Sequence, residues 1–596
     1  MGASGKDPMA RVAAALLGLV VALLLGPPAA AHEERDSEFP PGNGSVPRHR
    51  TLAQASDVLV VCKRDSERRI RALRDPRVRS FNLRLLDRCE YRDLQAAVDA
   101  VRKQRTNIYL LPGVYREKPS WDVPCMKSYD GGIVSYEQSY SCGEIVNLVT
   151  VAGDDPDDED IVCDGPQCHL QIEGTGARPG DVLFRGGFRG SDGDWVKHNG
   201  IKADRADGFY LANMTLELFR ENAVYVHETD GYAIKDIEVR NNDLYGVLAF
   251  TSDHGLIEDC NAHHNGDSGI YPGSASDVNA SSTETGPLDR WAVEVRRCNM
   301  HHNALGFSGT AGNSVYVHDN RMHHNGVGFV VESILAGHPG MPQDHGWFAR
   351  NKIYDNNVNY YENVQGPDAP CQEERAVDRG HQRGVVCPPL PLPVGTGGMI
   401  VGNHNYVDNN WVWGNHRQGF MLFWVPPALL REDFNPLHQT DNSNYNHYTR
   451  NKMGFTPAGA KRPNGLDVWW DDAGIGNCWE DNQAAPGASI THNALLGFLP
   501  DCSLPSLLPV GNLVKTTTLL PCAEFDRYSN PSPPGCDWIV TPPKPTKASI
   551  AAASAPSRRE PSNPMTALLL VGAGVAGAVG LRLGARRWAA READGR

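Results

Sequence analysis

The chain has 596 residues, of which 40% are hydrophobic and 21% are charged, and its formal net charge is −14. No long basic stripe with interleaved aromatic residues accompanies this acidic balance, so nucleic acid is excluded as a predicted partner. The one basic stretch, residues 64–84, also carries apolar residues and is predicted to be a solvated, partly helical segment.

The first residues have the layout of a secretory signal peptide. Lys6 and Arg11 precede an uncharged apolar run over residues 12–25, and Ala29–Ala31 supply a small-x-small cleavage site. The run is too short for a comfortable membrane span. We therefore predict a signal peptide and a mature chain that starts at His32, with an uncleaved anchor as the alternative.

A second apolar run lies near the other end of the sequence. Residues 565–581 carry no charge and are followed by four arginines between positions 582 and 591. With residues 583–585 added, the run reaches about 30 Å at about 1.5 Å per residue, which crosses a bilayer core. The arginines place its far end in the cytoplasm by the positive-inside rule. The predicted localisation is the cell membrane, single-pass, with an extracellular body.

Fourteen cysteines form an even set in an exported chain, which predicts disulfides. Pairing in sequence order gives Cys62–Cys89, Cys125–Cys142, Cys163–Cys168, Cys371–Cys387, Cys478–Cys502 and Cys522–Cys536. The remaining two, Cys260 and Cys298, occupy equivalent places in a repeat and are either a buried thiol stack or a disulfide.

The middle of the chain repeats a six-residue pattern that ends in asparagine. Its copies are Cys260–Asn265, Cys298–Asn303, Asn320–Asn325, Asn351–Asn356 and Asn410–Asn415. The shortest spacing between the final asparagines is 22 residues, and loop insertions account for the longer ones. Apolar residues alternate between the copies, as in Val293-Glu-Val295, which predicts short strands. Short coils of parallel strands stacked on one axis fit this repeat, whereas helical repeats have longer periods.

The repeated asparagines have a physical role in such a stack. Neighbouring coils lie about 4.8 Å apart, so equivalent inward amides can both donate to and accept from one another along a column. We therefore predict structural roles for Asn265, Asn303, Asn325, Asn356 and Asn415. A glycine that follows most of these asparagines allows the positive φ that a sharp corner needs.

This pattern resembles the right-handed parallel β-helix proteins of the pectin lyase-like superfamily, in their bacterial cell-surface form. Residues 91–100 and 108–117 look like that family's capping helix and first strand, and residues 149–153 look like the next strand. The fold class is thus predicted to be all-β, a right-handed parallel β-helix with an amino-terminal capping helix. The predicted organisation is a signal peptide (1–31), an extension (32–85), the β-helix (86–500), a disulfide-containing segment (501–540), a stalk (541–564), a transmembrane helix (565–585) and a tail (586–596).

Long insertions locate the predicted functional edge. They cover about 275–290, 334–345, 365–400 and 426–443, and loops on a rigid scaffold are the usual place for binding residues. Paired carboxylates serve glycoside hydrolysis, and flat aromatic rings suit sugars. The candidate catalytic residues are Asp253, Glu332, Glu362, Asp471 and Asp472. The candidate substrate-binding residues are His227, Tyr271, Trp424, Trp469 and Trp470. Alternatively, the tryptophans cover the end of the solenoid and the carboxylates are solvated.

The known catalytic motifs of the superfamily are mostly missing. Asp471-Asp472 and Asp253-His254-Gly255 are isolated fragments of the polygalacturonase series. Neither the pectin methylesterase motif nor the calcium-binding aspartates of pectate lyases can be placed. The sequence thus leaves the cofactor open, with Ca²⁺ expected only if the protein is a lyase, and it leaves open whether the protein is an enzyme.

Pairs of histidines recur on consecutive coils, and His264, His302 and His324 are candidate metal ligands. The superfamily includes an accessory protein of copper-enzyme maturation, yet no carboxylate or cysteine recurs to complete the ligand set. A polar stack at the turns is the alternative.

Three functions therefore compete. The first is a membrane-anchored extracellular protein that binds an extracellular polysaccharide or cell-wall glycan. In one version it also cleaves or modifies that glycan, as a lyase, hydrolase or epimerase. The second is a non-catalytic structural or adhesive module, and the third is a metal accessory protein that uses the histidines.

Overall fold

The computed structural model describes residues 37–116, 147–154, 161–186, 198–335, 338–366, 368–372, 384–426 and 435–554. The described residues up to Ala553 belong to one compact unit. The predicted signal peptide, the predicted Cys125–Cys142 pair and the predicted transmembrane helix and tail lie outside these ranges.

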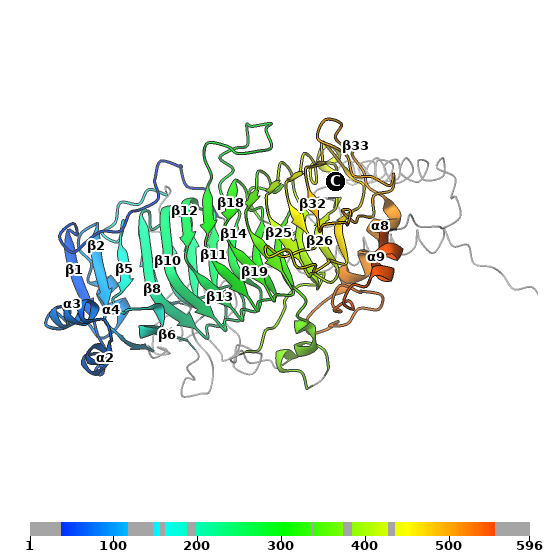
Figure 1. Cartoon of the computed structure of the whole chain (residues 1–596). Coiled ribbons are helices and arrows are strands. Elements are labelled where there is room, and N and C mark those ends of the chain that lie inside the picture. The colour runs from blue at the N-terminus through cyan, green and yellow to red at the C-terminus, as the bar shows by residue number, and fades with distance from the viewer. Residues whose placement is uncertain are drawn as a thin grey trace, which may run out of the picture. The chain divides into compact units, whose positions relative to one another are not determined.

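Parallel strands of successive coils lie side by side in two large sheets (Figure 1). In its regular part each coil contributes two strands to the larger sheet, called sheet A here, and one strand to the other, sheet B. Sheet A consists of β1 (Asp57–Val61), β2 (Thr106–Leu110), β3 (Gly113–Tyr115), β5 (Gln171–Gly174), β6 (Val182–Arg185), β8 (Phe209–Glu217), β10 (Asp230–Arg240), β12 (Asp253–Glu258), β13 (Asn261–His263), β15 (Val293–Arg296), β16 (Asn299–His301), β18 (Val315–His318), β19 (Arg321–His323), β21 (Trp347–Ala349), β22 (Lys352–Tyr354), β24 (Tyr406–Asp408), β25 (Trp411–Trp413), β27 (His447–Thr449), β28 (Lys452–Met453), β31 (Cys478–Glu480) and β32 (Gln483–Ala484).

Sheet B runs parallel through ten coils. Its strands are β4 (Asn147–Ala152), β7 (Asn199–Asp204), β9 (Val224–His227), β11 (Val247–Phe250), β14 (Ser268–Gly273), β17 (Leu305–Thr310), β20 (Val327–Glu332), β23 (Thr396–Val401), β26 (Gln418–Leu422) and β29 (Leu466–Trp470). A small antiparallel pair, β30 (Gly474–Ile475) and β33 (Leu507–Leu508), follows the last coils.

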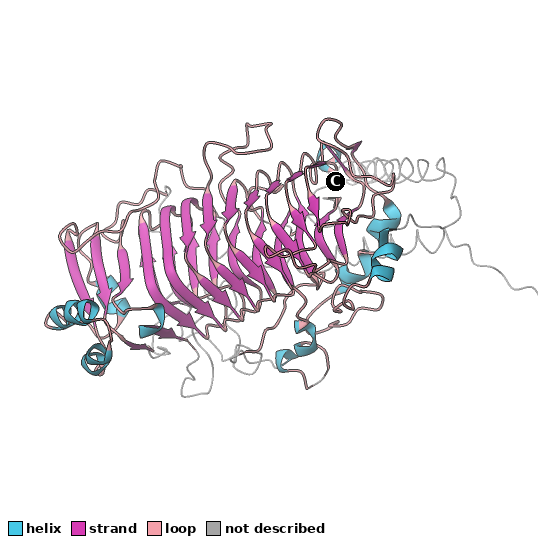
Figure 2. Ribbon diagram, viewed as in Figure 1, coloured by secondary structure: helices cyan, strands magenta, loops and turns pink. Residues whose placement is uncertain are grey.

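Among the described residues helices are few and short, as Figure 2 shows. The α-helices are α2 (Ser66–Ala72), α3 (Pro76–Leu86), α4 (Leu94–Asp99), α8 (Leu513–Thr517) and α9 (Lys547–Ser554); the 3₁₀ helices are η2 (Pro179–Asp181), η3 (Tyr360–Asn363), η4 (Pro370–Gln372), η5 (Pro436–His438) and η6 (Leu520–Glu524). The predicted capping helix is α4, which contacts β1, β2 and β4. Its Leu94, Ala97 and Val98 are fully buried, as their helical spacing predicts.

Strand alternation builds the core between the sheets. In β15 the valines Val293 and Val295 are fully buried while Glu294 between them is partly exposed, because successive side chains point to opposite faces. Inward phenylalanines stack between coils, with the Phe329 and Phe348 ring centroids 4.7 Å apart. Each such fully buried side chain contributes roughly 1.5–3 kcal/mol of hydrophobic stabilisation.

The predicted asparagines form one continuous ladder at the turn between sheet A and sheet B. The amide Nδ2 of Asn265 donates to Oδ1 of Asn303 (2.9 Å), and Asn303, Asn325, Asn356 and Asn415 continue the chain of bonds at 3.0–3.3 Å. Each Oδ1 also accepts from the backbone N–H of the preceding asparagine in the ladder. The ladder thus pairs buried backbone groups that the turn leaves without a strand partner.

The structure contains two more asparagine ladders, which were not predicted from the sequence. One links Asn320, Asn351, Asn410, Asn451 and Asn482, and another links Asn405, Asn446 and Asn477. Cys298 takes the next place in the first of these, because its backbone N–H donates to Oδ1 of Asn320. Cys260 and Cys298 are both buried free thiols, so the disulfide alternative for them is wrong.

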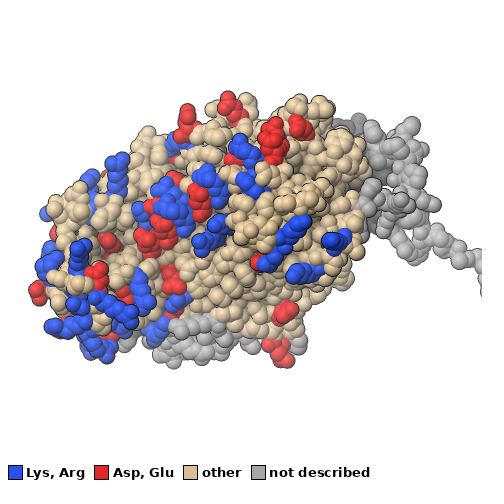
Figure 3. Space-filling model, in the orientation of Figure 1, with Lys and Arg blue, Asp and Glu red and all other residues tan. Residues whose placement is uncertain are grey.

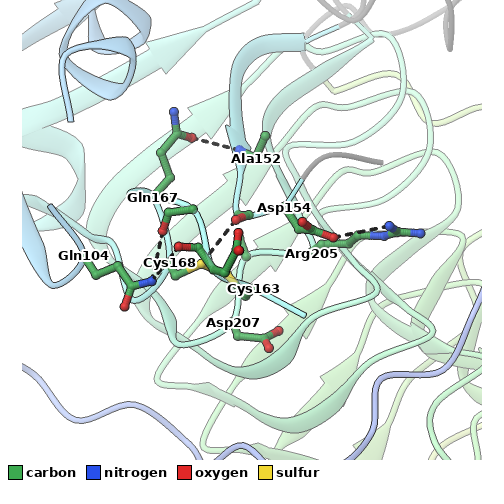
Figure 4. The surroundings of a disulfide bond; sticks show 12 residues. Gln104, Ala152, Asp154, Cys163, Gln167, Cys168, Arg205 and Asp207 are labelled. Carbon is green, nitrogen blue, oxygen red and sulfur yellow. Dashed lines mark hydrogen bonds and ion pairs between the residues drawn. A yellow bond between two sulfur atoms is a disulfide. The ribbon is translucent and has the colours of Figure 1, made fainter. Parts of the chain in front are cut away.

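Five of the six predicted disulfides are confirmed. They are Cys62–Cys89, Cys163–Cys168, Cys371–Cys387, Cys478–Cys502 and Cys522–Cys536. Figure 4 shows Cys163–Cys168, which closes a short loop that Gln167 fastens to the backbone N–H of Ala152 (2.9 Å). In the same view Arg205 reaches Asp154 (3.4 Å), one of the acids in the loop after β4.

Two aspects of the predicted organisation differ in the structure. Sheet A begins at β1, which pairs in parallel with β2, so strand pairing starts upstream of residue 86. Three of the long insertions join a strand of sheet B to the next strand of sheet A, whereas residues 365–400 join β22 to β23 at a different turn. The four insertions therefore do not wall one groove, because the coil leaves the sheets at two separate corners.

One finding contradicts the predicted localisation as a single-pass membrane protein. Within the described ranges, no helix combines the length and the apolar character that crossing a bilayer requires. The apolar run that prompted the prediction, residues 565–585, lies outside those ranges.

Candidate functional site

The predicted catalytic carboxylates lie on separate elements. Asp253 starts β12 and Glu332 ends β20, while Glu362 is exposed on η3. Glu332 pairs with the hydroxyl of Thr310 on the neighbouring coil. From Glu332 to Asp471, after β29, the register crosses three coils, or about 14 Å at about 4.8 Å each. The five residues do not converge on one scissile bond.

Asp471 and Asp472 hold the end of the β-helix together. Asp471 is fully buried and accepts the backbone N–H groups of Trp424 (3.0 Å) and Ala473 (3.0 Å). Burial raises the pKa of its carboxyl to about 7. Asp472 pairs with Lys515 of α8 at 2.6 Å, which fastens the carboxyl-terminal segment to the last coil. These contacts fasten the end of the solenoid, but both carboxylates are buried and not solvated as the alternative had it. Their catalytic roles stay predictions.

The predicted tryptophans are also packed away. Trp424 and Trp470 are 7% and 5% exposed, and their indole N–H groups donate to the carbonyls of Gln439 and Ala473 (both 2.8 Å). Trp469 is partly buried beside Phe423, with ring centroids 6.4 Å apart. Trp424 and Trp470 are thus buried, whereas Trp469 is partly exposed.

A segment that we name the amino-terminal strap, residues 37–50, covers the predicted residue His227. The hydroxyl of Ser37 lies 2.8 Å from Nε2 of His227, and the backbone N–H of Glu38 donates to Glu228 (2.8 Å). Tyr271, the other predicted binding residue of this region, is 2% exposed and lies 3.2 Å from Nε2 of His338. A ligand reaches either side chain only after the covering groups move. The substrate-binding roles stay predictions.

The recurring histidines form two ring stacks at the turn. His264, His302 and His324 stack with centroids 5.1 and 5.5 Å apart, and all three have positive φ. Each contacts the preceding histidine, Nδ1 to Nδ1, at 2.7–2.8 Å. The described residues contain several groups of three metal-capable side chains within reach of one another, and none of those groups includes these histidines. Their metal role stays a prediction, and the geometry is that of a polar turn stack.

An aromatic row on the outer face of sheet A was not anticipated. Tyr316, Trp347 and Tyr406 occupy one register position on β18, β21 and β24. The first two rings stack with centroids 4.1 Å apart, and the ring centroid of Trp291 lies 5.8–5.9 Å from both. Arg350 donates to the hydroxyl of Tyr316 (2.9 Å), as Arg450 does to that of Tyr406 (2.9 Å).

A basic row runs beside the aromatic one. Arg321, Lys352, Trp411 and Lys452 occupy one register position on β19, β22, β25 and β28, and Lys452 lies 5.9 Å from the centroid of the Trp411 ring. Over the described residues, the three cations form no ion pair with a carboxylate, whereas Arg350 and Arg450 pair with Asp319 and Asp408. In the region of β25 and β32 the visible charged side chains are mostly basic (Figure 3).

A surface hollow of about 530 Å³ lies at the end of the basic row. Asn409, Arg450, Lys452, Asp481, Asn482 and Gln483 line it. The sequence carries a signal for the basic row, because each member directly follows an asparagine of the ladder that links Asn320 to Asn482. These asparagines are at positions 320, 351, 410 and 451. Reading that position across the repeats would have found it.

Comparisons with known proteins bear on the fold. A family model described as "Right handed beta helix region" matches residues 185–333 and 222–451. No curated protein sequence matches the chain. Among solved structures, the A-module of the Azotobacter vinelandii mannuronan C-5 epimerase AlgE4 is 14% identical with a TM-score of 0.34, over 67% of this chain and 94% of that one.

Two further solved structures are similar at the same level. Pectate lyase Pel9A is 14% identical with a TM-score of 0.30, over 73% of this chain and 82% of that one. The periplasmic alginate epimerase AlgG is 11% identical with a TM-score of 0.34, over 64% and 60%. At such identities and scores these structures say nothing about the reaction of this chain.

The fold itself rests on the chain's own repeats. Its parallel register, its asparagine ladders and the family match over residues 185–451 agree with one another. The chain contains a right-handed parallel β-helix.

Proposed function

We propose that the outer face of sheet A binds an anionic polysaccharide along the axis of the β-helix. The observation that carries the proposal is the basic row of Arg321, Lys352 and Lys452, which has no carboxylate ion partner among the described residues. Like charges on neighbouring strands repel, so the row costs stability unless an anion bridges it. A uronate- or sulfate-bearing polymer supplies such anions at regular intervals.

The aromatic row complements the basic one. Trp291, Tyr316 and Trp347 are only partly buried, although rings of this size normally pack into a core. Sugar rings offer apolar C–H faces and hydroxyl edges. Aromatic rings suit the first, and the tyrosine hydroxyls, each held by an arginine, suit the second.

The rows follow the geometry of an extended polymer. Both cross successive coils at about 4.8 Å per step, so a chain laid along the axis meets a new side chain at each step. The hollow at Arg450 and Lys452 lies at one end of this track. Catalysis is not part of the proposal, because the predicted carboxylates do not meet on this face.

The test compares binding of polyanions and neutral glycans by the purified full chain. Polygalacturonate and alginate are titrated by calorimetry, with dextran as the neutral polymer, at low and high salt. We expect binding of the polyanions, weakened by salt because charge pairs are screened. The variant R321Q/K352Q/K452Q should lower the affinity at least tenfold. Product formation in the same mixtures shows turnover if there is any.

A charge-matched control separates this face from net charge. R64Q/R74Q/R77Q removes the same three charges from exposed positions on or beside α2 and α3, and it should bind like the unmodified protein. Equal losses in both variants would overturn the proposal, and so would dextran binding as tight as that of the polyanions. A circular dichroism spectrum confirms that each variant is folded.

A further inference from the structure

We propose that Asp344, His345 and His404 form a binding site for a divalent transition-metal ion. The site lies where two coils enter sheet A: Asp344 and His345 precede β21, and His404 precedes β24. One ligand atom from each of the three residues lies within 4.8 Å of those from the other two. It is distinct from the histidine stacks at the turn into sheet B.

The spacing of the donor atoms suits a shared ion. Oδ1 of Asp344 lies 2.8 Å from Nδ1 of His404 and 3.2 Å from Nδ1 of His345. Ligands bonded to one metal at about 2.0–2.2 Å with angles near 90–110° are separated by about 3.0–3.5 Å. The two imidazole rings are parallel within 6°, with centroids 4.8 Å apart. Because an imidazole nitrogen binds a metal in the plane of its ring, the two stacked rings turn toward the ion when it binds.

His345 supplies an independent indication of a ligand. Its side chain is 1% exposed, and neither ring nitrogen makes a hydrogen bond of normal geometry. A backbone group of Ser282 also lies near the ring. A buried imidazole without a proper partner costs free energy, and a metal ion that the ring binds removes that cost.

The same tripeptide elsewhere in the chain shows how the charge is balanced without a metal. Asp253-His254-Gly255 repeats Asp344-His345-Gly346 at the start of a sheet A strand. There Arg290 bonds to Asp253 (2.7 Å) and donates to Nε2 of His254 (2.9 Å). An arginine therefore fills the place between carboxylate and imidazole in the first copy.

The second copy has no such cation. In the described part of the chain, Asp344 forms ion pairs only with His345 and His404, and no Lys or Arg pairs with it. Asp277 lies close enough to interact electrostatically with both Asp344 and His404, and its Oδ1 accepts from Ser314 (3.2 Å). Two carboxylates and two imidazoles thus converge without an arginine or lysine, and a dication would balance them.

The donor set defines the class of ion. Imidazole nitrogens with carboxylate oxygens suit Zn²⁺, Co²⁺, Ni²⁺ and Cu²⁺, whereas Ca²⁺ and Mg²⁺ prefer oxygen alone. Other groups of this kind are less suitable. His447 lies beside Cys478 and Cys502, whose sulfurs form a disulfide, and the group around His227 and Glu228 includes the cation Arg205.

The test measures uptake of Zn²⁺ by the full chain in equilibrium dialysis, with metal analysis of the dialysed protein. We expect one tightly held ion per chain, and a visible ligand-field spectrum when Co²⁺ replaces it. H345A/H404A should lose that ion. Asp344→Asn, which keeps the shape of the side chain and its bond to the backbone N–H of His345 (2.9 Å), should weaken binding at least tenfold.

Two control variants make the assignment specific. H254A removes the histidine of the arginine-filled copy, and H302A/H324A removes two rings of the turn stack; both should keep the ion. Loss of the ion in H302A/H324A but not in H345A/H404A would overturn the proposal. So would absence of a stoichiometric ion from the unmodified protein. If H345A/H404A is unfolded by circular dichroism, Asp344→Asn decides, and unchanged uptake by it refutes the site.

Discussion

Replacing Asn325 with alanine tests the ladder at its centre. The Asn325 side chain accepts the backbone N–H of Asn303 (2.9 Å) and donates to the carbonyl of Met300 (3.1 Å) and to Oδ1 of Asn356 (3.0 Å). All of this lies in a fully buried environment. Alanine removes every one of these bonds.

The cost follows from the groups left unpaired. The N–H of Asn303 loses its partner, and the carbonyl of Met300 loses one donor. A buried unsatisfied group costs about 1–3 kcal/mol, and each further lost bond about 0.5–1.5 kcal/mol. Asn356 keeps a donor, because its Oδ1 also accepts the backbone N–H of Asn325. We therefore expect the free energy of unfolding to fall by about 2–4 kcal/mol.

The assay is urea unfolding followed by fluorescence, combined with hydrogen exchange of the Asn303 amide. That amide should exchange much faster in Asn325→Ala, since its acceptor is gone. The control is Asn299→Ala on the preceding coil, a partly exposed asparagine whose Nδ2 donates to Asn261 (3.0 Å). It should cost less than about 1 kcal/mol. A loss below about 1 kcal/mol at Asn325, or equal losses at both positions, would refute the ladder argument.

Three further predictions concern ionisable groups. Burial, followed by repulsion from neighbouring histidines, lowers the pKa values of His264 and His323 to about 4 and of His301 to about 3; the unfolded chain then binds more protons, so stability is retained above about pH 6.5 and falls as pH decreases toward 3. Thermal melts from pH 7 to 4 should show this fall, a shallower one in His301→Gln, and an identical slope would contradict the assignment. Burial raises the pKa of the Asp267 carboxyl to about 7, so the folded state holds the extra proton and stability decreases as pH rises from about 4 to 7. In urea unfolding, the stability of Asp267→Asn relative to the unmodified protein should be greater at pH 8 than at pH 5. A stability difference that does not change with pH would exclude this cause. Lys352→Gln removes repulsion with Arg321 on the next strand and should stabilise the free protein by about 0.2–0.5 kcal/mol. The exposed Lys103→Gln is its control, and a destabilised Lys352→Gln would show that the row is already paired.

Several features could be predicted from the sequence because they are local or periodic. The 22-residue spacing between Asn303 and Asn325, with alternating valines between the repeats, was enough for the β-helix. A buried face at helical spacing was enough for α4. Five disulfides followed from order along the chain, since each closes a loop of 27 residues or fewer.

The candidate sites were a different matter. Asp471, Trp424 and Trp470 are buried, and the side chain of each bonds to a backbone group. The sequence does not show which backbone group a given side chain will meet. The aromatic and basic rows of sheet A are hard to see in the linear sequence, because insertions separate their members. Arg321, Lys352 and Lys452 share one repeat position, and the parallel register brings them into line.

The sequence by itself determined the coil, its ladder and its covalent closures, because each depends on residue types at a fixed short period. The tertiary structure alone decided which side chains are accessible. Ser37 covers His227 across 190 positions, and Arg290 balances Asp253 while Asp344 meets His404 across 60. Contacts at such separations depend on how many residues each loop inserts between coils. No single repeat shows how long the neighbouring loops are. The exposure of a side chain and the balance of its charge are therefore known only once the coils are stacked.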